Sequence, residues 1–229
     1  MKKKYIILIL ASLFVFSSCT THPLWGLNRN RKNTLYRNMR EPDFKEPAEK
    51  GEINLNLSLP YLNSISHKPE DEPEKNTAGF IGLSAGVDFV YKKNKYIKIS
   101  FGGITDLPVP IGPLDRGGEY EQQRLAYMDI LNVHKLNRIS FGYGLSIGKY
   151  NWYHYKEIPD SANPYRIETA EKNHFSFGLP ACVYFQTGRS FYIGLIYRPT
   201  LYRPSLPEKF KYEHSASIDF SWKIGLKKK

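Results

Sequence analysis

The sequence has few cysteines and, beyond its first twenty residues, no long hydrophobic run. Cys19 and Cys182 are its only cysteines, so one disulfide between them is possible in an oxidising compartment, but a disulfide-rich framework is excluded. No stretch after residue 20 approaches the roughly 20 apolar residues that a membrane-spanning helix needs. Aromatic residues make up 14% of the chain, which is too many for a disordered protein.

Signatures of nucleic-acid, nucleotide and metal binding are also absent from the sequence. The net charge is +11, but much of it comes from Lys2–Lys4, from Lys227–Lys229, from one N-terminal segment and from short turns. There is no zinc-finger spacing, basic recognition helix or phosphate-binding glycine loop. His22, His67 and His134 lack metal-ligand spacing. We therefore expect no nucleic-acid partner, no cofactor and no metal.

Residues 1–19 have the parts of an export signal. Lys2–Lys4 form a charged start, and Tyr5–Phe16 form an apolar segment too short to span a bilayer. The segment ends in Phe16-Ser17-Ser18-Cys19, which resembles a lipobox, where small residues precede a cysteine that is lipid-modified and becomes N-terminal. This resemblance implies a lipid anchor on Cys19, with acyl chains such as palmitate. The alternative is an ordinary secretory peptide cut near Ser18, with Cys19 an incidental thiol.

Residues 20–50 are polar, contain proline and carry a basic cluster. Such a segment can lie along anionic headgroups, where each basic residue contributes about 1 kcal/mol, or it can be a solvated periplasmic linker. The cluster consists of Arg29, Arg31, Lys32, Arg37 and Arg40.

From residue 51 onward, apolar residues alternate with small or polar ones, which is the signature of β-strands. The apolar rows are Ile53–Leu59, Ile81–Tyr91, Ile97–Phe101, Ile139–Ile147, Phe175–Phe185, Phe191–Tyr197 and Ile218–Ile224. An eighth strand, near Ala126–His134, has no cleanly apolar face and is included because an even number closes the topology. Pro180 and Pro199 fall inside strands and require a bulge or an unpaired carbonyl.

Short and long connections alternate along these strands. Tight turns are expected at Lys92–Lys95, Lys135–Arg138 and Gln186–Ser190, and long loops at Tyr61–Thr77, Ile104–Leu125, Tyr153–Asn173 and Tyr202–Lys211. Outer-membrane barrels have short periplasmic turns, long outer loops and an even number of strands. Both termini then lie on the periplasmic side, where a lipid on Cys19 would also be.

The residues opposite the apolar rows separate a membrane barrel from a soluble β-sandwich. A sandwich exposes its polar row to water, so that row should carry large charged side chains. Here it holds mainly glycine, serine and asparagine, which suit the narrow interior of an eight-stranded barrel. Seven tyrosines are expected near strand ends, as in interfacial girdles. They are Tyr91, Tyr96, Tyr143, Tyr153, Tyr155, Tyr197 and Tyr202.

With these features, residues 51–226 resemble the small eight-stranded outer-membrane barrels of the OmpA-like and OmpX-like class. The resemblance implies an all-β, antiparallel up-and-down (meander) barrel, followed by a basic tail at residues 227–229. It is architectural and rests on no sequence motif. Those barrels usually end on an aromatic residue, whereas here Trp222 is followed by four residues and three lysines.

The inward row carries isolated charges that we expect to form a network filling the lumen, with a proton or ion path as the alternative. They are Asp88, Lys98, Arg198, Asp219 and Lys223. If the turn after Tyr91 pairs Tyr91 with Ile97, then Asp88 faces Ser100 and lies diagonal to Lys98, within reach of a long side chain. Cys182 falls in the same inward row as a buried thiol.

One short motif suggests catalysis. His174-Phe175-Ser176 has the His-x-Ser spacing of the outer-membrane lipid A deacylases, and a strand places both side chains on one face, where a base could activate a hydroxyl. However, no carboxylate follows at an obvious spacing, and Ser176 falls on the lumen side.

Three functions remain open at this point. The leading hypothesis is a lipid-anchored outer-membrane barrel of a Gram-negative bacterium, with a structural or surface-interaction role. Its net acidic outer loops could contact a surface polymer, a cation or a protein partner. The alternatives are a lipid A-modifying hydrolase using His174 and Ser176, and a periplasmic, lipid-anchored β-barrel that binds a small apolar ligand. The acidic residues are Glu70, Asp71, Glu72 and Glu74 in the first loop, and Asp106, Asp115, Glu119 and Glu121 in the second.

Overall fold

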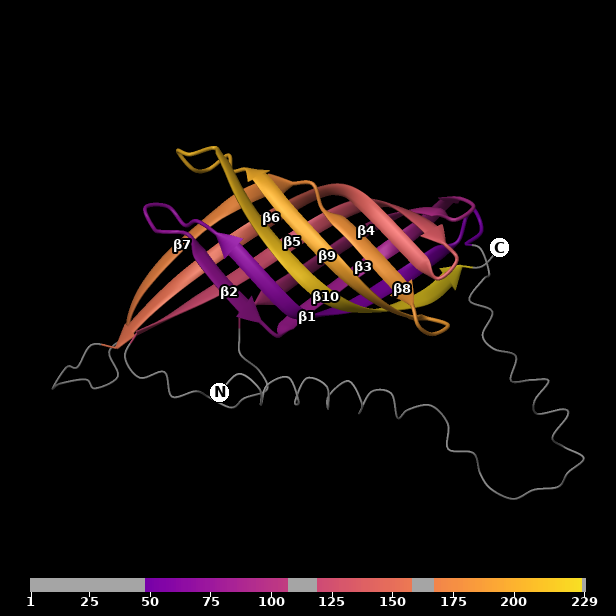
Figure 1. Ribbon diagram of the computed structural model, residues 1–229, viewed down its shortest axis with the longest axis horizontal. Coiled ribbons are helices and arrows are strands. Elements are labelled where there is room, and N and C mark those ends of the chain that lie inside the picture. Colours follow the sequence, from indigo (N-terminus) through magenta and orange to yellow (C-terminus); the bar gives the residue numbers. More distant parts are fainter. Residues whose placement is uncertain (1–47, 107–118, 158–166, 228–229) are drawn as a thin grey trace, which may run out of the picture. The chain divides into compact units, whose positions relative to one another are not determined.

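The chain forms one antiparallel β-sheet that closes into a barrel (Figure 1). This architecture is seen in a computed structural model, which describes residues 48–106, 119–157 and 167–227. The strands are β1 (Ile53–His67), β2 (Lys75–Gly79), β3 (Ile81–Lys92), β4 (Lys95–Thr105), β5 (Glu119–Leu136), β6 (Ile139–Glu157), β7 (Ile167–Gly178), β8 (Ala181–Gln186), β9 (Phe191–Tyr202) and β10 (Phe210–Lys227). The predicted all-β meander is confirmed.

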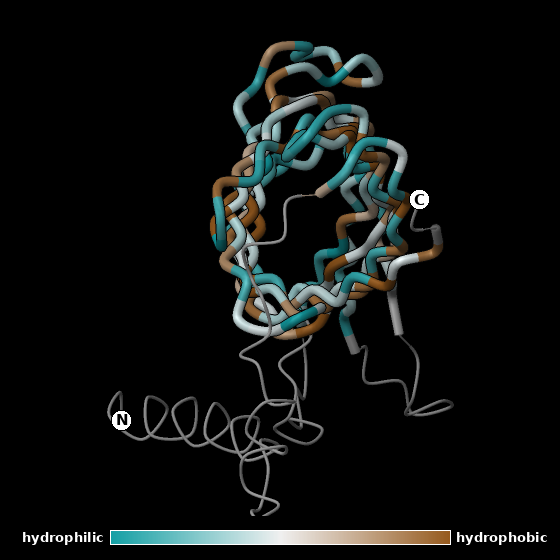
Figure 2. The backbone as a smooth tube through the Cα atoms, turned by 90° about the vertical axis from the view of Figure 1, so that its right-hand side faces the viewer, coloured by the Kyte–Doolittle hydropathy of each residue, from teal (hydrophilic) through white to brown (hydrophobic). Residues whose placement is uncertain are grey.

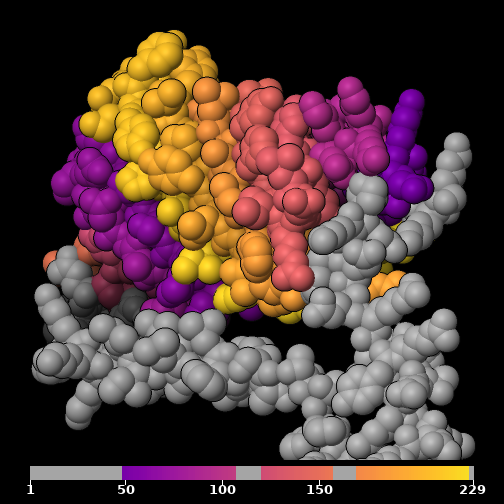
Figure 3. Space-filling model, turned by 45° about the vertical axis from the view of Figure 1, so that its right-hand side comes forward, coloured from indigo at the N-terminus to yellow at the C-terminus, as the bar shows by residue number. Residues whose placement is uncertain are grey.

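We call each crossing of the barrel wall a stave, and the ten strands form eight of them. β2 and β3 are two parts of one stave, separated by Phe80, and β7 and β8 are two parts of another, separated by Leu179 and Pro180. Each stave pairs with the next along the chain, and β10 pairs with both β9 and β1. The first and last strands therefore lie side by side, indigo beside yellow in Figure 3. This closure removes the open edges that an eight-stranded sheet would otherwise expose.

Two of the short turns reverse the chain through an asparagine in the left-handed region, with φ of 61° at Asn94 and 55° at Asn137. Asparagine tolerates this conformation better than most residues with a side chain. The turn at Asn94 also corrects one prediction. Asp88 lies opposite Lys98, not opposite Ser100. The register differs because the chain turns between Lys92 and Lys95, and the pairing is irregular between Val90 and Lys92.

The outer connections are shorter than predicted because the strands continue beyond their apolar rows. β1 runs to His67, and β2 begins within the predicted first loop. β6 continues to residue 157 and β7 begins at residue 167. Strand pairing needs only backbone hydrogen bonds, so it extends where the alternation of apolar residues has already stopped.

Among the described residues, no helix is long and apolar enough to cross a bilayer.

The two prolines lie at and opposite the break between β7 and β8, and the carbonyls of both are paired. Contrary to the prediction, Pro180 is therefore not inside a strand. Pro180 falls in the break between β7 and β8, and its carbonyl accepts a hydrogen bond from the Gly144 backbone N–H. Pro199 lies within β9, and its carbonyl accepts the Leu179 N–H.

The polarity of the barrel is the reverse of that of a water-soluble protein. Large apolar side chains such as Leu83, Phe101, Leu145 and Leu195 point outward and are exposed. Figure 2 shows apolar and polar positions interleaved around the ring of strands. The buried inward positions are rich in hydroxyl side chains, namely Ser58, Ser84, Ser100, Ser140, Ser146, Ser176, Ser215, Ser217 and Ser221. Tyr96 was predicted to belong to an interfacial girdle of tyrosines, and this prediction is wrong. Its position in β4 directs it into the barrel, where it is only 4% exposed.

The outward apolar rows form a band with two ends. Toward the long loops, the band ends at Leu62 in β1, Ile147 in β6 and Ala216 in β10, and polar side chains such as Lys149 follow. At the other end, it stops at the short turns. Below, "apolar band" means this zone, "loop end" the side of the long connections and "turn end" the side of the short turns.

Two apolar clusters fill parts of the interior. The cluster toward the turn end consists of Val90, Tyr96, Leu131, Val133, Cys182, Tyr184, Tyr192 and Ile196. The cluster toward the loop end consists of Ile65, Ile104, Leu125, Tyr127 and Tyr150. Cys182 is a free thiol in the first cluster, buried as predicted. The lumen is therefore packed with side chains at these two levels, as expected for eight strands.

Several predictions concern residues outside the described part of the chain. These are the export signal at residues 1–19 with Cys19, the basic segment up to residue 47, Asp115 in the second outer loop, and the last two lysines of the tail.

Candidate functional site

The charges predicted to line the lumen are buried together in the middle of the barrel. Lys223 Nζ lies 2.6 Å from Asp88 Oδ2. Lys98 Nζ donates to the Tyr184 hydroxyl at 3.1 Å, and that hydroxyl donates to Asp219 Oδ2 at 2.7 Å. Each buried charge thus has a partner of opposite sign or a bridging hydroxyl, which is the condition for burying charges at tolerable cost.

Arg198 has a partner that the sequence analysis did not identify. Its Nε lies 2.9 Å from Asp129 Oδ2, and Ser146 Oγ donates to the other carboxylate oxygen at 2.6 Å. The Arg198 guanidinium also stacks over the Tyr127 ring at 3.7 Å. Asp129 was missed because it lies on β5, whose faces alternate poorly. The available signal was that Asp129 alternates with Tyr127 and Leu131 along the same face of β5, which points inward.

A second polar cluster lies at the loop end of the lumen and is centred on Glu213 of β10. His174 Nε2 is 2.9 and 3.0 Å from the two Glu213 oxygens, and Ser176 Oγ donates to Oε2 at 2.7 Å. Arg203 Nη1 donates to Oε1 at 3.1 Å, and so does the Lys68 backbone N–H. Glu213 therefore joins β7, β10, the start of the β1–β2 connection and the β9–β10 connection.

The two residues of the His-x-Ser motif are brought together on one carboxylate, but not as a nucleophile and its base. The Ser176 hydroxyl donates to Glu213, so its proton points at the carboxylate, and the serine is 0% exposed. In the His-x-Ser hypothesis the histidine would have to accept the proton of the serine hydroxyl, whereas here both side chains contact Glu213. In this geometry His174 and Ser176 satisfy a buried carboxylate.

The charge state of this cluster follows from its contacts. Burial raises the pKa of Glu213, but its contacts with His174, the Ser176 hydroxyl and the Lys68 N–H lower it by more, so the net shift is downward. Burial lowers the pKa of His67 to about 4, against an opposing effect of Glu213. At neutral pH Glu213 is therefore ionised and His67 is uncharged.

Three aromatic rings stack beside Glu213. The His67 and Tyr150 ring centroids are 5.1 Å apart, and those of Tyr150 and His174 are 5.5 Å apart. Although two histidines and a glutamate are near one another, no group of metal-binding side chains is assembled anywhere in the described ranges. Glu213 was missed because it precedes the apolar alternation of β10, and its only signal in the sequence is that it shares alternate positions with the inward row of that strand.

Ion pairs also tie the outer connections together at the loop end. Lys75 Nζ lies 2.6 Å from Glu121, and the Lys172 Nζ lies 3.5 Å from Glu72. Partial burial raises the pKa of Glu121, but the hydrogen bonds from Lys75 and Trp152, with the positive charge of Lys75, lower it by more. Part of the acidic charge predicted for the outer loops is thus neutralised within the barrel domain.

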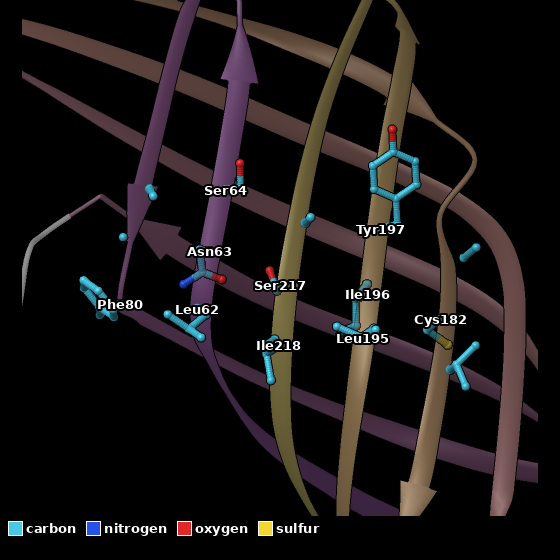
Figure 4. A pocket seen from close by; sticks show the side chains of 15 residues that line it. Leu62, Asn63, Ser64, Phe80, Cys182, Leu195, Ile196, Tyr197, Ser217 and Ile218 are labelled. Atoms are coloured by element: carbon cyan, nitrogen blue, oxygen red, sulfur yellow. The ribbon is translucent and has the colours of Figure 1, made fainter. Parts of the chain in front are cut away.

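A shallow apolar depression of about 540 Å³ lies on the wall formed by β1, β2, β8, β9 and β10 (Figure 4). Small outward residues such as Ser64, Ala181 and Ala216 form its floor, and larger ones such as Leu195 and Tyr197 stand beside them. Most of its outward-facing residues are apolar or small, so the depression belongs to the apolar band.

The fold defines a class of protein, the small eight-stranded antiparallel barrel with an apolar wall and a polar, packed interior. Solved structures of this kind are similar to the chain. The attachment invasion locus protein Ail of Yersinia pestis has 12% identity and a TM-score of 0.47, covering 76% of this chain and 99% of Ail. Neisserial surface protein A has 7% identity and a TM-score of 0.41, covering 75% of this chain and 96% of that protein.

The N-terminal β-barrel domain of Pseudomonas aeruginosa OprF has 7% identity and a TM-score of 0.41, covering 77% of this chain and 100% of that domain. No family model and no curated protein sequence matches the chain.

Proposed function

We propose that this protein is an outer-membrane β-barrel with a structural or surface-interaction role. The observation that carries the proposal is the reversed polarity of the wall. Leu145 is 63% exposed, whereas its neighbour Ser146 is 3% exposed. Water-soluble monomers rarely expose apolar patches beyond a few hundred Å², and an apolar band that encircles a closed barrel is what the hydrocarbon layer of a bilayer accommodates.

The filled interior favours a scaffold over a pore. Two apolar clusters and the ion pairs between them occupy the lumen, so water-filled passage has no evident route through the described part of the barrel. Ion pairs and the Glu213 cluster hold the outer connections in place. A rigid barrel that presents loops outward is suited to contacts with a surface polymer or a protein partner.

Membrane insertion is tested by single labels at two neighbouring positions. A fluorescent label on Cys at position 145 should be quenched by a lipid-soluble quencher, and the same label at position 146 should not. The reason is that alternate residues of a strand face opposite sides of the wall. The measurement is quenching in phospholipid vesicles, with Cys19 and Cys182 replaced by alanine in both proteins so that only the introduced thiol reacts.

A labelled Thr187 variant is a suitable control, because Thr187 lies in the turn after β8. An aqueous quencher should reach it in proteoliposomes opened with detergent. If the lipid-soluble quencher reaches neither 145 nor 146, the strands belong to a soluble domain, and the periplasmic ligand-binding barrel becomes the better account.

We also propose that Cys19 carries a lipid, on the strength of the Phe16-Ser17-Ser18-Cys19 motif. Replacing Cys19 with alanine should abolish labelling by radioactive palmitate and leave a precursor of higher mass. Replacing Cys182 with alanine is the matched control and should leave labelling unchanged. Undiminished labelling of the Cys19→Ala protein would contradict the proposal.

The hydrolase hypothesis has no supporting observation in the site. Ser176 is buried, donates its proton to Glu213 and faces the lumen, whereas a lipid substrate would approach the outer wall. We therefore assign His174, Ser176 and Glu213 to holding the loop end of the barrel together.

A further inference from the structure

The turn end of the barrel carries a ring of basic side chains contributed by every short turn. Three come from the β3–β4 turn, two from the β5–β6 turn and one from the β8–β9 connection. They are Lys92, Lys93, Lys95, Lys135, Arg138 and Arg189. Glu49 and Glu52, which precede β1, are carboxylates at the same end, so the end as a whole has an excess of positive charge.

These cations lie directly beyond the last side chains of the apolar band. Tyr91 is outward and exposed and precedes Lys92. Leu136 and Ile139 flank the turn that carries Arg138, and both are also exposed. The covalent chain therefore holds the charges within a few residues of the edge of the hydrocarbon layer, at the depth of lipid headgroups.

The cations of the two ends differ in their partners. At the loop end, Lys68, Lys75 and Lys172 each form an ion pair with a glutamate of an outer connection or of the outer end of β5. At the turn end, Lys92, Lys93, Lys95 and Arg189 make no ion pair with any residue that the structure describes. The charges of these four side chains are thus available to a partner outside the barrel domain.

We propose that this ring of cations binds the anionic phospholipid headgroups of the leaflet that surrounds the turn end. The inference rests on the proposed insertion in a membrane and specifies which lipid the barrel prefers on that side. A basic residue near an anionic membrane surface contributes about 1 kcal/mol, and the contribution falls off within a Debye length. The ring fixes the depth of the barrel and enriches anionic lipid around its turn end.

Trp222 provides a reporter at the right position. It is 44% exposed on the apolar band and pairs with Phe191, which directly follows the turn that holds Arg189. Trp25 and Trp152 are the other two tryptophans, and Trp152 is buried. In the full chain with Trp25→Phe and Trp152→Phe, the fluorescence of Trp222 reports the lipids beside it.

The experiment uses vesicles of equal parts phosphatidylcholine and phosphatidylglycerol, in which one or the other lipid carries brominated acyl chains. Brominated phosphatidylglycerol should quench Trp222 about twofold more than brominated phosphatidylcholine at low salt, from the headgroup attraction above. The excess should vanish in high salt, which shortens the Debye length. It should also vanish when the six ring cations are replaced by glutamine.

The matched control replaces six cations elsewhere with glutamine, namely Lys68, Lys149, Lys156, Lys172, Lys209 and Lys211, and should keep the excess. Equal quenching by the two lipids in the unaltered ring would overturn the inference while leaving membrane insertion intact. Quenching by neither lipid would instead overturn the insertion itself. If the Trp152→Phe protein does not fold, association of spin-labelled phosphatidylglycerol with the unaltered chain measures the same preference.

Discussion

Replacing Arg198 with methionine is expected to lower the free energy of unfolding by about 3–5 kcal/mol, because it leaves a buried carboxylate without its counter-charge. Arg198 and Asp129 are 2% and 1% exposed at the side chain, and their contact is 2.9 Å. Without the guanidinium, Asp129 keeps only the hydrogen bond from Ser146. The measurement is urea unfolding of the barrel in detergent micelles or vesicles, followed by tryptophan fluorescence.

A double variant and an exposed ion pair make this prediction specific. Adding Asp129→Leu to Arg198→Met should recover most of the lost stability, because an apolar pair can replace a buried ion pair at little cost. Lys68→Met breaks the exposed pair with Glu208 and should cost less than about 1 kcal/mol. If the double variant is no more stable than the single one, the loss comes from packing of the long Arg198 stem and not from the unpaired charge.

Replacing Gly144 with alanine is expected to destabilise the barrel by about 3 kcal/mol, at the upper end of the usual cost of overpacking. A methyl group there would overlap the Ile130 carbonyl oxygen and crowd the Leu131 Cα, both of which are backbone atoms that cannot turn aside. Gly144 also donates its backbone N–H to the Pro180 carbonyl at the break between β7 and β8. The approach of neighbouring staves therefore requires glycine at this position.

Two other glycines calibrate the Gly144 result in the same unfolding experiment. Gly142→Ala should cost less, because its new methyl would meet the Cys182 Sγ and a Val133 methyl, each at 2.9 Å, and side chains can shift. Gly103→Ala should be close to neutral, because its nearest neighbour would be at the ordinary distance of 3.6 Å. Equal effects at all three positions would show that inward volume does not limit the barrel.

Gly144→Arg extends this prediction to a large side chain. The inward position has no space for it, so it should be tolerated far worse than an arginine placed in an outer connection, for example Ser205→Arg in the exposed β9–β10 connection.

Local patterns in the sequence predicted seven of the eight strand regions, and only the strand near Ala126–His134 had to be added to close the topology. Strict alternation, as in Ile139–Ile147, locates a strand and separates its two faces whatever its neighbours are, since the period of two is a property of the backbone. Asn94 and Asn137 mark tight turns for a similarly local reason. The same rows correctly predicted that Asp88, Lys98 and Arg198 point inward and that Cys182 is buried.

Tertiary structure decided which of the inward residues meet, because that depends on the stagger between strands and on closure of the barrel. Asp88 lies opposite Lys98, and not opposite Ser100 as predicted, because the strand pairing is irregular between Val90 and Lys92. The residues that complete the polar clusters, Asp129 and Glu213, come from other strands. The outer ends of the strands could not be predicted either, since beyond the apolar band pairing continues without an apolar face. Sequence determined the strands and their faces; closure of the barrel assigned the partners across the lumen, because those contacts join residues far apart in the chain.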